Sequence, residues 1–177
     1  MKTTDPSIGR PGNRSFHRHH LLRLTLTVTC ITLWIAPRVV AVNPPPDGGY
    51  PNRTTAEGQN ALFNLTTGID NTAVGFAALW NNTMGSYNTA AGEQTLYVNV
   101  SGNYNAATGY RALYSNIGSK NTADGFRALF SNTTGNQNTA SGFQALYYNT
   151  DGEGNTATGN LALYKNVLGN SKHCHRI

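Results

Sequence analysis

The chain has 177 residues, of which 12% are charged and 38% hydrophobic, with 19 glycines and two cysteines. The charged fraction is about half of the usual ~25%, which excludes a highly charged disordered tail and a long charged coiled coil. Two cysteines are too few for a disulfide-rich scaffold or a four-cysteine zinc site. The formal net charge of +5 indicates an anionic partner only if its charges belong to the mature protein.

Residues 1–41 have the pattern of a secretory signal peptide. Basic residues lead into a 13-residue apolar run over 24–36, and Val39 and Ala41 occupy the −3 and −1 positions of a cleavage site after Ala41. The alternative is an uncleaved anchor, but Arg23 and Arg38 confine the apolar run to 14 residues, and a span needs about 20. We therefore expect a secreted or cell-surface protein with no stable membrane span after cleavage.

Removal of this segment changes the charge balance. Six of the 13 Lys and Arg residues and one of the eight Asp and Glu residues precede residue 42, so seven bases and seven acids remain. A formally neutral mature chain does not favour nucleic acid as a partner. Cys174 is the one cysteine that remains, so no intrachain disulfide is expected.

A Pro/Gly-rich linker over 42–53 precedes seven copies of a repeat over 54–170, with the consensus N-T-A-x-G-x-x-A-L-aromatic-x-N-x-x-G-x-x. Three columns define the repeat. The turn column is Gly58, Gly75, Gly92, Gly109, Gly125, Gly142 and Gly159. The core column is Leu62, Leu79, Leu96, Leu113, Leu129, Leu146 and Leu163. The column that follows Leu is Phe63, Trp80, Tyr97, Tyr114, Phe130, Tyr147 and Tyr164.

A 17-residue unit is too short for a helix-pair repeat or a propeller blade, and it suits one turn of a β-solenoid. We predict an all-β, parallel β-solenoid of seven turns. Asn-Thr-Ala-x-Gly alternates like a short strand. The second half of the unit fits either another strand or one helical turn, and we favour a strand-like corner. The one missing residue, between Asn116 and Gly118, is expected to shorten a surface turn.

The predicted core is thin, because one turn buries little more than a leucine and an aromatic ring. Further aromatic residues follow the turn glycine at Phe76, Tyr110, Phe126 and Phe143. A single coil cannot hide both aromatic sets, so a homo-oligomer is expected. The aromatic column after Leu is the candidate interface or ligand stripe.

Asn71-Thr72-Ala73-Val74-Gly75 and Asn138-Thr139-Ala140-Ser141-Gly142 resemble the head repeats of trimeric autotransporter adhesins (YadA-like). They are similar also to the N-T-A-x-G-x-x-A-L arrays of bacterial surface and phage tail-fibre-like proteins. The resemblance covers 54–170 and implies a left-handed β-roll, a homotrimer and a role in surface attachment. A host-surface protein or a glycan would then be the ligand.

After the last repeat, residues 171–177 are expected to form a short irregular tail, and the array to be a shortened version of a longer one. His173-Cys174-His175 places three metal-ligand types too close in sequence to converge on one tetrahedral ion. No metal site, cofactor loop or catalytic constellation is predicted.

The function predicted from sequence is an adhesin-like structural and binding module without catalysis. The alternatives are a non-adhesive fibre or spacer segment and an ice-binding solenoid, for which the threonine column of the repeat is the candidate. Ice binding favours paired threonine columns, and only one recurs here. Five N-x-[ST] sequons, at Asn52, Asn64, Asn81, Asn99 and Asn132, are expected from composition alone.

Overall fold

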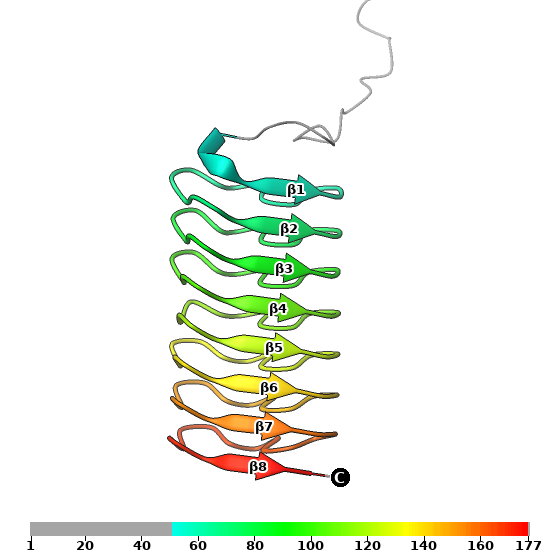
Figure 1. The fold of residues 1–177 in the computed structure, drawn as a ribbon, viewed down its shortest axis with the longest axis vertical. Helices are drawn as coiled ribbons and strands as arrows, with labels where there is room; N and C mark the ends of the chain where they lie inside the picture. Colours follow the sequence, from blue (N-terminus) through cyan, green and yellow to red (C-terminus); the bar gives the residue numbers. More distant parts are fainter. Residues whose placement is uncertain (1–50, 177) are drawn as a thin grey trace, which may run out of the picture. The chain divides into compact units, whose positions relative to one another are not determined.

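The computed structural model describes residues 51–176, and these form a parallel β-solenoid of about seven turns (Figure 1). The predicted signal peptide and most of the predicted linker lie outside the described residues. A short 3-10 turn, η1 (Pro51–Arg53), precedes the first coil. The strands are β1 (Thr55–Glu57), β2 (Thr72–Val74), β3 (Thr89–Ala91), β4 (Ala106–Thr108), β5 (Thr122–Asp124), β6 (Thr139–Ser141), β7 (Thr156–Thr158) and β8 (His173–His175).

Each coil contributes one strand, and consecutive strands pair in parallel in the order β1 to β8. The register aligns equivalent residues of successive repeats, so that Ala73 lies beside Ala56 and Ala90. The central alanine of each strand from β1 to β7 is buried, and its two neighbours point outward. The predicted all-β parallel solenoid is confirmed.

The carboxy-terminal residues differ from the expected irregular tail. His173–His175 form β8, which pairs in register with β7 and places Cys174 beside Ala157. Cys174 packs against the apolar core, and the two histidines are exposed. This strand was not predicted because His-Cys-His stands where the repeat consensus has Thr-Ala-x. Parallel pairing requires backbone groups rather than particular side chains, so the eighth strand forms without the consensus.

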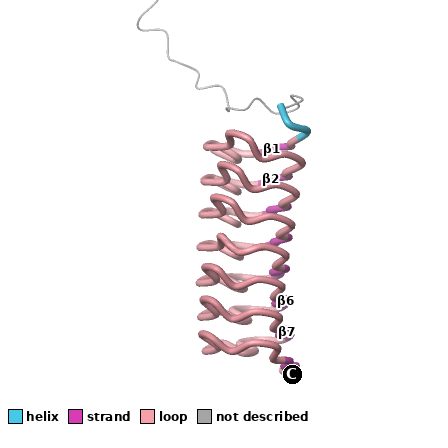
Figure 2. Tube along the Cα trace, turned by 90° about the vertical axis from the view of Figure 1, so that its left-hand side faces the viewer, coloured by secondary structure: helices cyan, strands magenta, loops and turns pink. Residues whose placement is uncertain are grey.

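The second half of each coil is neither a strand nor a helix but a run of turns (Figure 2). Leu79 has φ 51° and Ala77 has φ 53°, and the same two columns are left-handed in every coil. A left-handed residue costs roughly 1–2 kcal/mol. Hydrogen bonds between coils offset this cost: the Leu79 amide donates to Thr95 O at 3.0 Å, and the Asn81 amide to Tyr97 O at 3.0 Å.

The apolar core is a column of alanines and leucines. Leu79, Leu96, Leu113, Leu129 and Leu146 are fully buried, and Leu62 is 6% exposed. Leu163 is only partly buried, because β8 covers only part of its coil. The leucine column thus lies inside the coil, with the alanines of the strands and of the turns packed against it.

Two ladders of buried asparagines complete the interior. The strand-side Asn ladder is Asn71, Asn88, Asn105, Asn121, Asn138 and Asn155, and the turn-side Asn ladder is Asn82, Asn99, Asn116, Asn132, Asn149 and Asn166. In the first, Asn105 Nδ2 donates to Asn88 Oδ1 at 3.1 Å and to Gly118 O at 2.9 Å. In the second, Asn99 Nδ2 donates to Asn82 Oδ1 at 2.9 Å. Burying an amide is costly unless it is hydrogen-bonded, and adjacent coils satisfy these amides along both ladders except at Asn166 in the last coil, whose Oδ1 has no partner.

The two glycine columns serve different purposes. Gly75 has φ 125°, in a region that side chains rarely adopt. A Cβ on Gly85 would lie 2.5 Å from Gly102 O and would also overlap Asn82 Oδ1. The first column therefore needs glycine for its backbone angle, and the second for the close approach of the next coil.

The 16-residue coil between Asn105 and Lys120 keeps both Asn ladders. Asn116 Nδ2 still donates to Asn99 Oδ1 at 2.9 Å and to Gly118 O at 2.8 Å. One bond changes, since Asn121 Nδ2 donates to Asn116 Oδ1 at 3.1 Å rather than to Asn105. The missing residue is therefore absorbed in the turn that contains Ile117, and the interior is continuous.

Candidate functional site: two aromatic ladders with arginines between them

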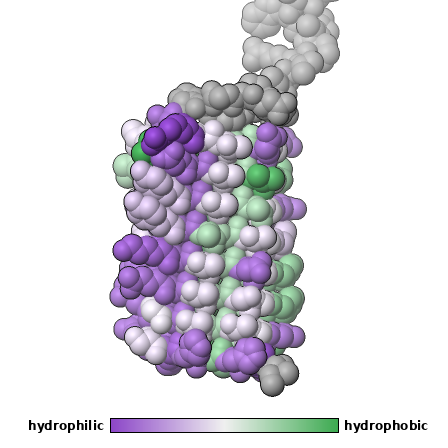
Figure 3. Space-filling model, in the orientation of Figure 1, coloured by the Kyte–Doolittle hydropathy of each residue, from purple (hydrophilic) through white to green (hydrophobic). Residues whose placement is uncertain are grey.

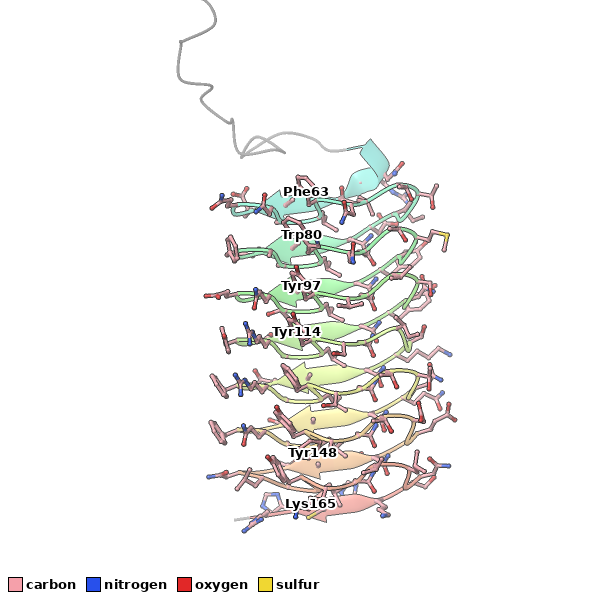
Figure 4. The ribbon with its side chains drawn as sticks, turned by 180° about the vertical axis from the view of Figure 1, so that it is seen from behind. Phe63, Trp80, Tyr97, Tyr114, Tyr148 and Lys165 are labelled. Carbon is pink, nitrogen blue, oxygen red and sulfur yellow. The ribbon has the colours of Figure 1, made fainter. Side chains whose placement is uncertain are left out.

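The aromatic residues that follow each core leucine form one continuous stack, here called the long aromatic ladder. Figure 4 shows Phe63, Trp80, Tyr97 and Tyr114 in a column in front of the strands when the solenoid is seen from behind. Successive ring centroids are 4.7, 6.1, 5.1, 5.2, 5.1 and 5.3 Å apart from Phe63 to Tyr164. Because Leu is turned inward by its left-handed backbone, the next side chain in each coil points outward.

The rings of this ladder stack face on face, so each ring covers the faces of its neighbours. Phe63, at the first coil, is 51% exposed, and the other six rings are partly buried. What the ladder presents to solvent is therefore mainly ring edges and tyrosine hydroxyl groups. This geometry differs from an isolated exposed ring, whose face is free to stack on a sugar.

A second stack, the short aromatic ladder, is formed by Tyr110, Phe126 and Phe143, each of which follows a turn glycine. Their centroids are 5.3 and 5.2 Å apart, and Phe143 is 48% exposed. Glu93 occupies this column one coil before Tyr110, so the stack begins at Tyr110. In the space-filling view, residues of similar hydropathy form bands along the solenoid (Figure 3).

Two arginines lie between these ladders. The Cζ atom of Arg111 is 5.0 Å from the ring centroid of Tyr110 in the short ladder and 5.4 Å from that of Tyr114 in the long one. Arg127 Cζ is 5.1 Å from the Phe126 centroid and 5.6 Å from the Phe130 centroid. Arg127 Cζ is also 5.9 Å from the Tyr110 centroid, so each guanidinium contacts rings of both ladders.

The hydrogen bonds of the two arginines differ. Arg111 Nε donates to Gln94 Oε1 at 2.6 Å, whereas Arg127 Nε is buried without a partner. Within residues 51–176 the one ion pair joins Arg53 to Asp70 at 2.7 Å, so no carboxylate neutralises Arg111 or Arg127. Neither arginine was among the residues predicted for a ligand or an interface. The available signal was two consecutive arginines in one column of the repeat, each two residues after a turn glycine.

A separate group of exposed apolar residues, here called the apolar edge, lies in some of the turns that lead into the strands. These turns are on the left of Figure 1. Met84, Tyr104 and Leu168 are 56%, 57% and 66% exposed there, and Tyr87 stacks on Tyr104 at 4.8 Å. These residues occupy the columns just before and after the second glycine of the repeat. They are distinct from both aromatic ladders, and they were not among the residues predicted for an interface.

One carboxylate outside the core has a shifted pKa. Thr134 Oγ1 and Thr133 Oγ1, one coil before Asp151, donate to its Oδ1. The hydrogen bond from Thr134, followed by that from Thr133, lowers the pKa of Asp151 below its usual value. Near the last coil, burial and a hydrogen bond with Tyr148 raise the pKa of Tyr164.

The histidine and cysteine side chains of β8 do not converge. Cys174 points toward the core and the two histidines point outward, because side chains alternate along a strand. Within residues 51–176, no three His, Cys, Asp or Glu side chains are placed to hold one metal ion. That the protein lacks metal and cofactor remains a prediction.

The outward faces of the strands carry one threonine column and one mixed column. Four of the six threonines that open the strands are followed two residues later by a residue other than Thr or Ser, at Glu57, Val74, Ala91 and Asp124. The sequons divide by burial: Asn99 and Asn132 lie in the turn-side Asn ladder and are inaccessible in the folded protein. Asn52 is exposed, and Asn64 and Asn81 are partly buried and bonded to each other at 2.7 Å.

Comparisons with protein-family models, with curated proteins and with solved structures each gave no match. No helix within the described part of the chain has the length and apolar character needed to cross a bilayer.

Proposed function

We propose that this chain is a secreted or surface-exposed adhesin-like module, structural and binding in role and without catalysis. The observation that carries the proposal is the pair of aromatic ladders on the outside of the solenoid. Phe126 and Phe143 are well exposed, although monomeric proteins rarely present long continuous apolar surfaces without a partner. The ligand is a glycan or a protein on a host surface, and it contacts ring edges, tyrosine hydroxyls and the polar side chains between the ladders.

The proposed assembly is a trimer of left-handed rolls, and the separate apolar edge supports it. Met84, Tyr104 and Leu168 are more than half exposed, and a second copy would cover them. Contact through this edge leaves both aromatic ladders available to ligands. Closed symmetry would let each chain use the same edge.

Light scattering on the secreted protein tests the assembly, with an expected mass three times that of one chain. Met84→Thr combined with Tyr104→Gln should release monomers. Both replacements already occur in those columns, at Thr134 and Gln137, so the coil should fold unchanged. A monodisperse monomer of the unaltered protein would contradict the trimer.

Binding itself is tested by glycan arrays and by attachment of the labelled protein to host-type surfaces. We expect binding that Phe126→Gln combined with Phe143→Gln weakens, since Gln59 occupies the same column in the first coil. The control is Thr89→Ala, on the outward face of a strand, because Ala106 occupies the same column in the next coil and the change lies outside both the ladders and the apolar edge. Absence of any bound surface would contradict the adhesin-like role.

A non-adhesive fibre or spacer segment is the second candidate, and the interior favours it. Both Asn ladders run through the coils without a break, including the short coil, which gives a regular rod suited to presenting another domain. A rod-shaped particle by small-angle scattering, together with no ligand on any surface, would favour the spacer over the adhesin.

A further inference from the structure

We propose that Arg111 and Arg127 form a binding site for an acidic sugar, one that carries a carboxylate or a sulfate within a polysaccharide. The inference rests on the binding role proposed above and assigns it a ligand class and a position. It places the centre of recognition in the polar strip between the two aromatic ladders, in the fourth and fifth coils.

The first step is the state of the guanidinium groups. The Nε atom of Arg111 donates to Gln94, and its Nη atoms form no hydrogen bond. The guanidinium of Arg127 forms no hydrogen bond, although the backbone amide of this residue donates to Tyr110 O at 2.9 Å. The Arg127 Nε is buried, while the Nη atoms of both residues are neither buried nor bonded. Guanidinium Nη groups with no internal acceptor are the donors that bind carboxylate and sulfate oxygens in pairs.

The second step is the charge around the site. Successive coils stack about 5 Å apart, so the two cations are neighbours in one column and repel each other. Two acids lie near this column in the repeat: Glu93, whose backbone oxygen accepts from the Arg111 amide at 3.0 Å, and Asp124, three residues before Arg127. Neither carboxylate forms an ion pair with either arginine. An anion bound across both groups would relieve this repulsion.

The third step is the rigidity of the site. Arg111 lies over Tyr110 and Tyr114, and Arg127 lies over Phe126 and Phe130. Contact with rings on both sides restricts the long side chains before a ligand arrives. Binding therefore loses less conformational entropy than it would with freely moving surface arginines.

The fourth step distinguishes a sugar from other anions. The column reads Gln94, Arg111, Arg127, Gln144, so a neutral amide stands at each end of the cationic pair. Amides and tyrosine hydroxyls recognise sugar hydroxyl groups, and two cations suit a single acidic group. Nucleic acid, whose affinity comes from many phosphate contacts, would need more cations than this face provides.

The test measures binding of the secreted full-length protein to polygalacturonate, a carboxylate polymer, and to dextran sulfate, with neutral dextran as the uncharged reference. Arg127→Gln is compared with Lys120→Gln. Each removes one cation, and each places glutamine where the next coil already has it, at Gln144 and Gln137. Thermal unfolding of both variants checks that the coil is intact.

We expect at least one polyanion to bind more tightly than dextran, and Arg127→Gln to weaken that binding by ~10-fold, the loss typical of a hydrogen bond to a charged group. Lys120→Gln should change it less than twofold. Equal losses in the two variants would overturn the site, and so would unchanged binding in Arg127→Gln. Equal competition by poly-L-glutamate would overturn the assignment to a sugar.

The outcome also separates this inference from the adhesin-like role. If neither polyanion binds but the protein still attaches to neutral glycans or host-type surfaces, the acidic-sugar site is wrong and the proposed function stands. If no surface of any kind binds the protein, both are wrong.

Discussion

The interior Asn ladders and the exterior aromatic ladders repeat with the same period, but they tolerate variation differently. Every position of the strand-side Asn ladder from Asn71 to Asn155 is asparagine, and the ladder ends at Lys172. The long aromatic ladder mixes Phe, Trp and Tyr. An interior amide must donate and accept at fixed positions in the coils beside it, whereas stacked rings need only a flat face. The hydrogen bonds of the interior therefore require the same residue type in every coil, whereas stacking requires only a flat aromatic ring.

The sharpest way to break the interior is to replace one central asparagine. Asn105→Ala would remove donors to Asn88 Oδ1 and Gly118 O and the acceptor of the Asn121 amide. Of these groups only the Asn121 amide is left unpaired, because the Asn105 backbone amide still donates to Asn88 Oδ1 and Asn116 Nδ2 still donates to Gly118 O. One unpaired buried donor, at ~1–3 kcal/mol, and two lost hydrogen bonds, at ~0.5–1.5 kcal/mol each, should together lower the free energy of unfolding by roughly 3–5 kcal/mol. Urea denaturation measures the loss. Asn160→Ala, at an exposed position, is the control and should have almost no effect.

The neighbouring pair Leu113 and Tyr114 allows the same comparison within two consecutive residues. Leu113 is fully buried, so Leu113→Ala leaves a cavity and should cost about 3 kcal/mol, within the usual ~2–5 kcal/mol range. Leu113 has a left-handed backbone with φ 50°, which alanine adopts as readily as leucine does. The loss of unfolding free energy therefore measures the packing of the side chain. If Leu113→Ala lowered the free energy of unfolding by less than the replacement of the Tyr114 ring, the assignment of the leucine column to the core would be contradicted.

Replacing the ring beside it should cost less. Tyr114→Ala removes two stacking contacts, with Tyr97 at 5.1 Å and Phe130 at 5.2 Å, and one ring that holds Arg111. Because the ring is only partly buried, we expect a loss of about 1–2 kcal/mol by the same denaturation measurement. Tyr114→Phe keeps the stack and should be close to neutral. Equal losses in the two variants would mean that the hydroxyl, rather than the stack, matters.

This contrast explains how far the sequence could predict the structure. The period, the turn glycines and the Leu-aromatic pairs indicated a parallel solenoid, because every coil must align the same residues with the next. From the sequence alone, the asparagine column that begins at Asn71 fits either turns or a ladder, and no prediction covers the turn-side ladder that contains Asn82. Asparagine is buried here because other asparagines and the carbonyl groups of the second glycine column satisfy its side-chain amide. The residue type considered alone predicts a surface position.

Two other features of the structure were not predicted from the sequence, for related reasons. Leu79 and its equivalents in the other coils have a left-handed backbone, which leucine rarely adopts. Hydrogen bonds between coils and burial of the side chain in the core stabilise it. Arg111 and Arg127 recur in just two coils, so no column of the consensus marks them. Features that depend on the adjacent coil, rather than on local propensity, are those that sequence reasoning missed.

The smallest expected effect concerns Asp151, an exterior carboxylate bonded to the previous coil. Its pKa is lowered in the folded protein by Thr134 and Thr133, so its contribution to stability is present above the unfolded pKa and is lost as pH falls through the folded value. Because the group is exposed, water competes with both hydroxyl groups and the contribution is small. Melting temperatures at pH 6 and pH 3 should therefore differ slightly less in Asp151→Asn than in the unaltered protein. If the change in melting temperature between pH 6 and pH 3 were the same in both proteins, the hydrogen bonds from the threonines would not contribute to stability. Hydrogen bonds between coils would then stabilise the solenoid in its interior and not on its exterior.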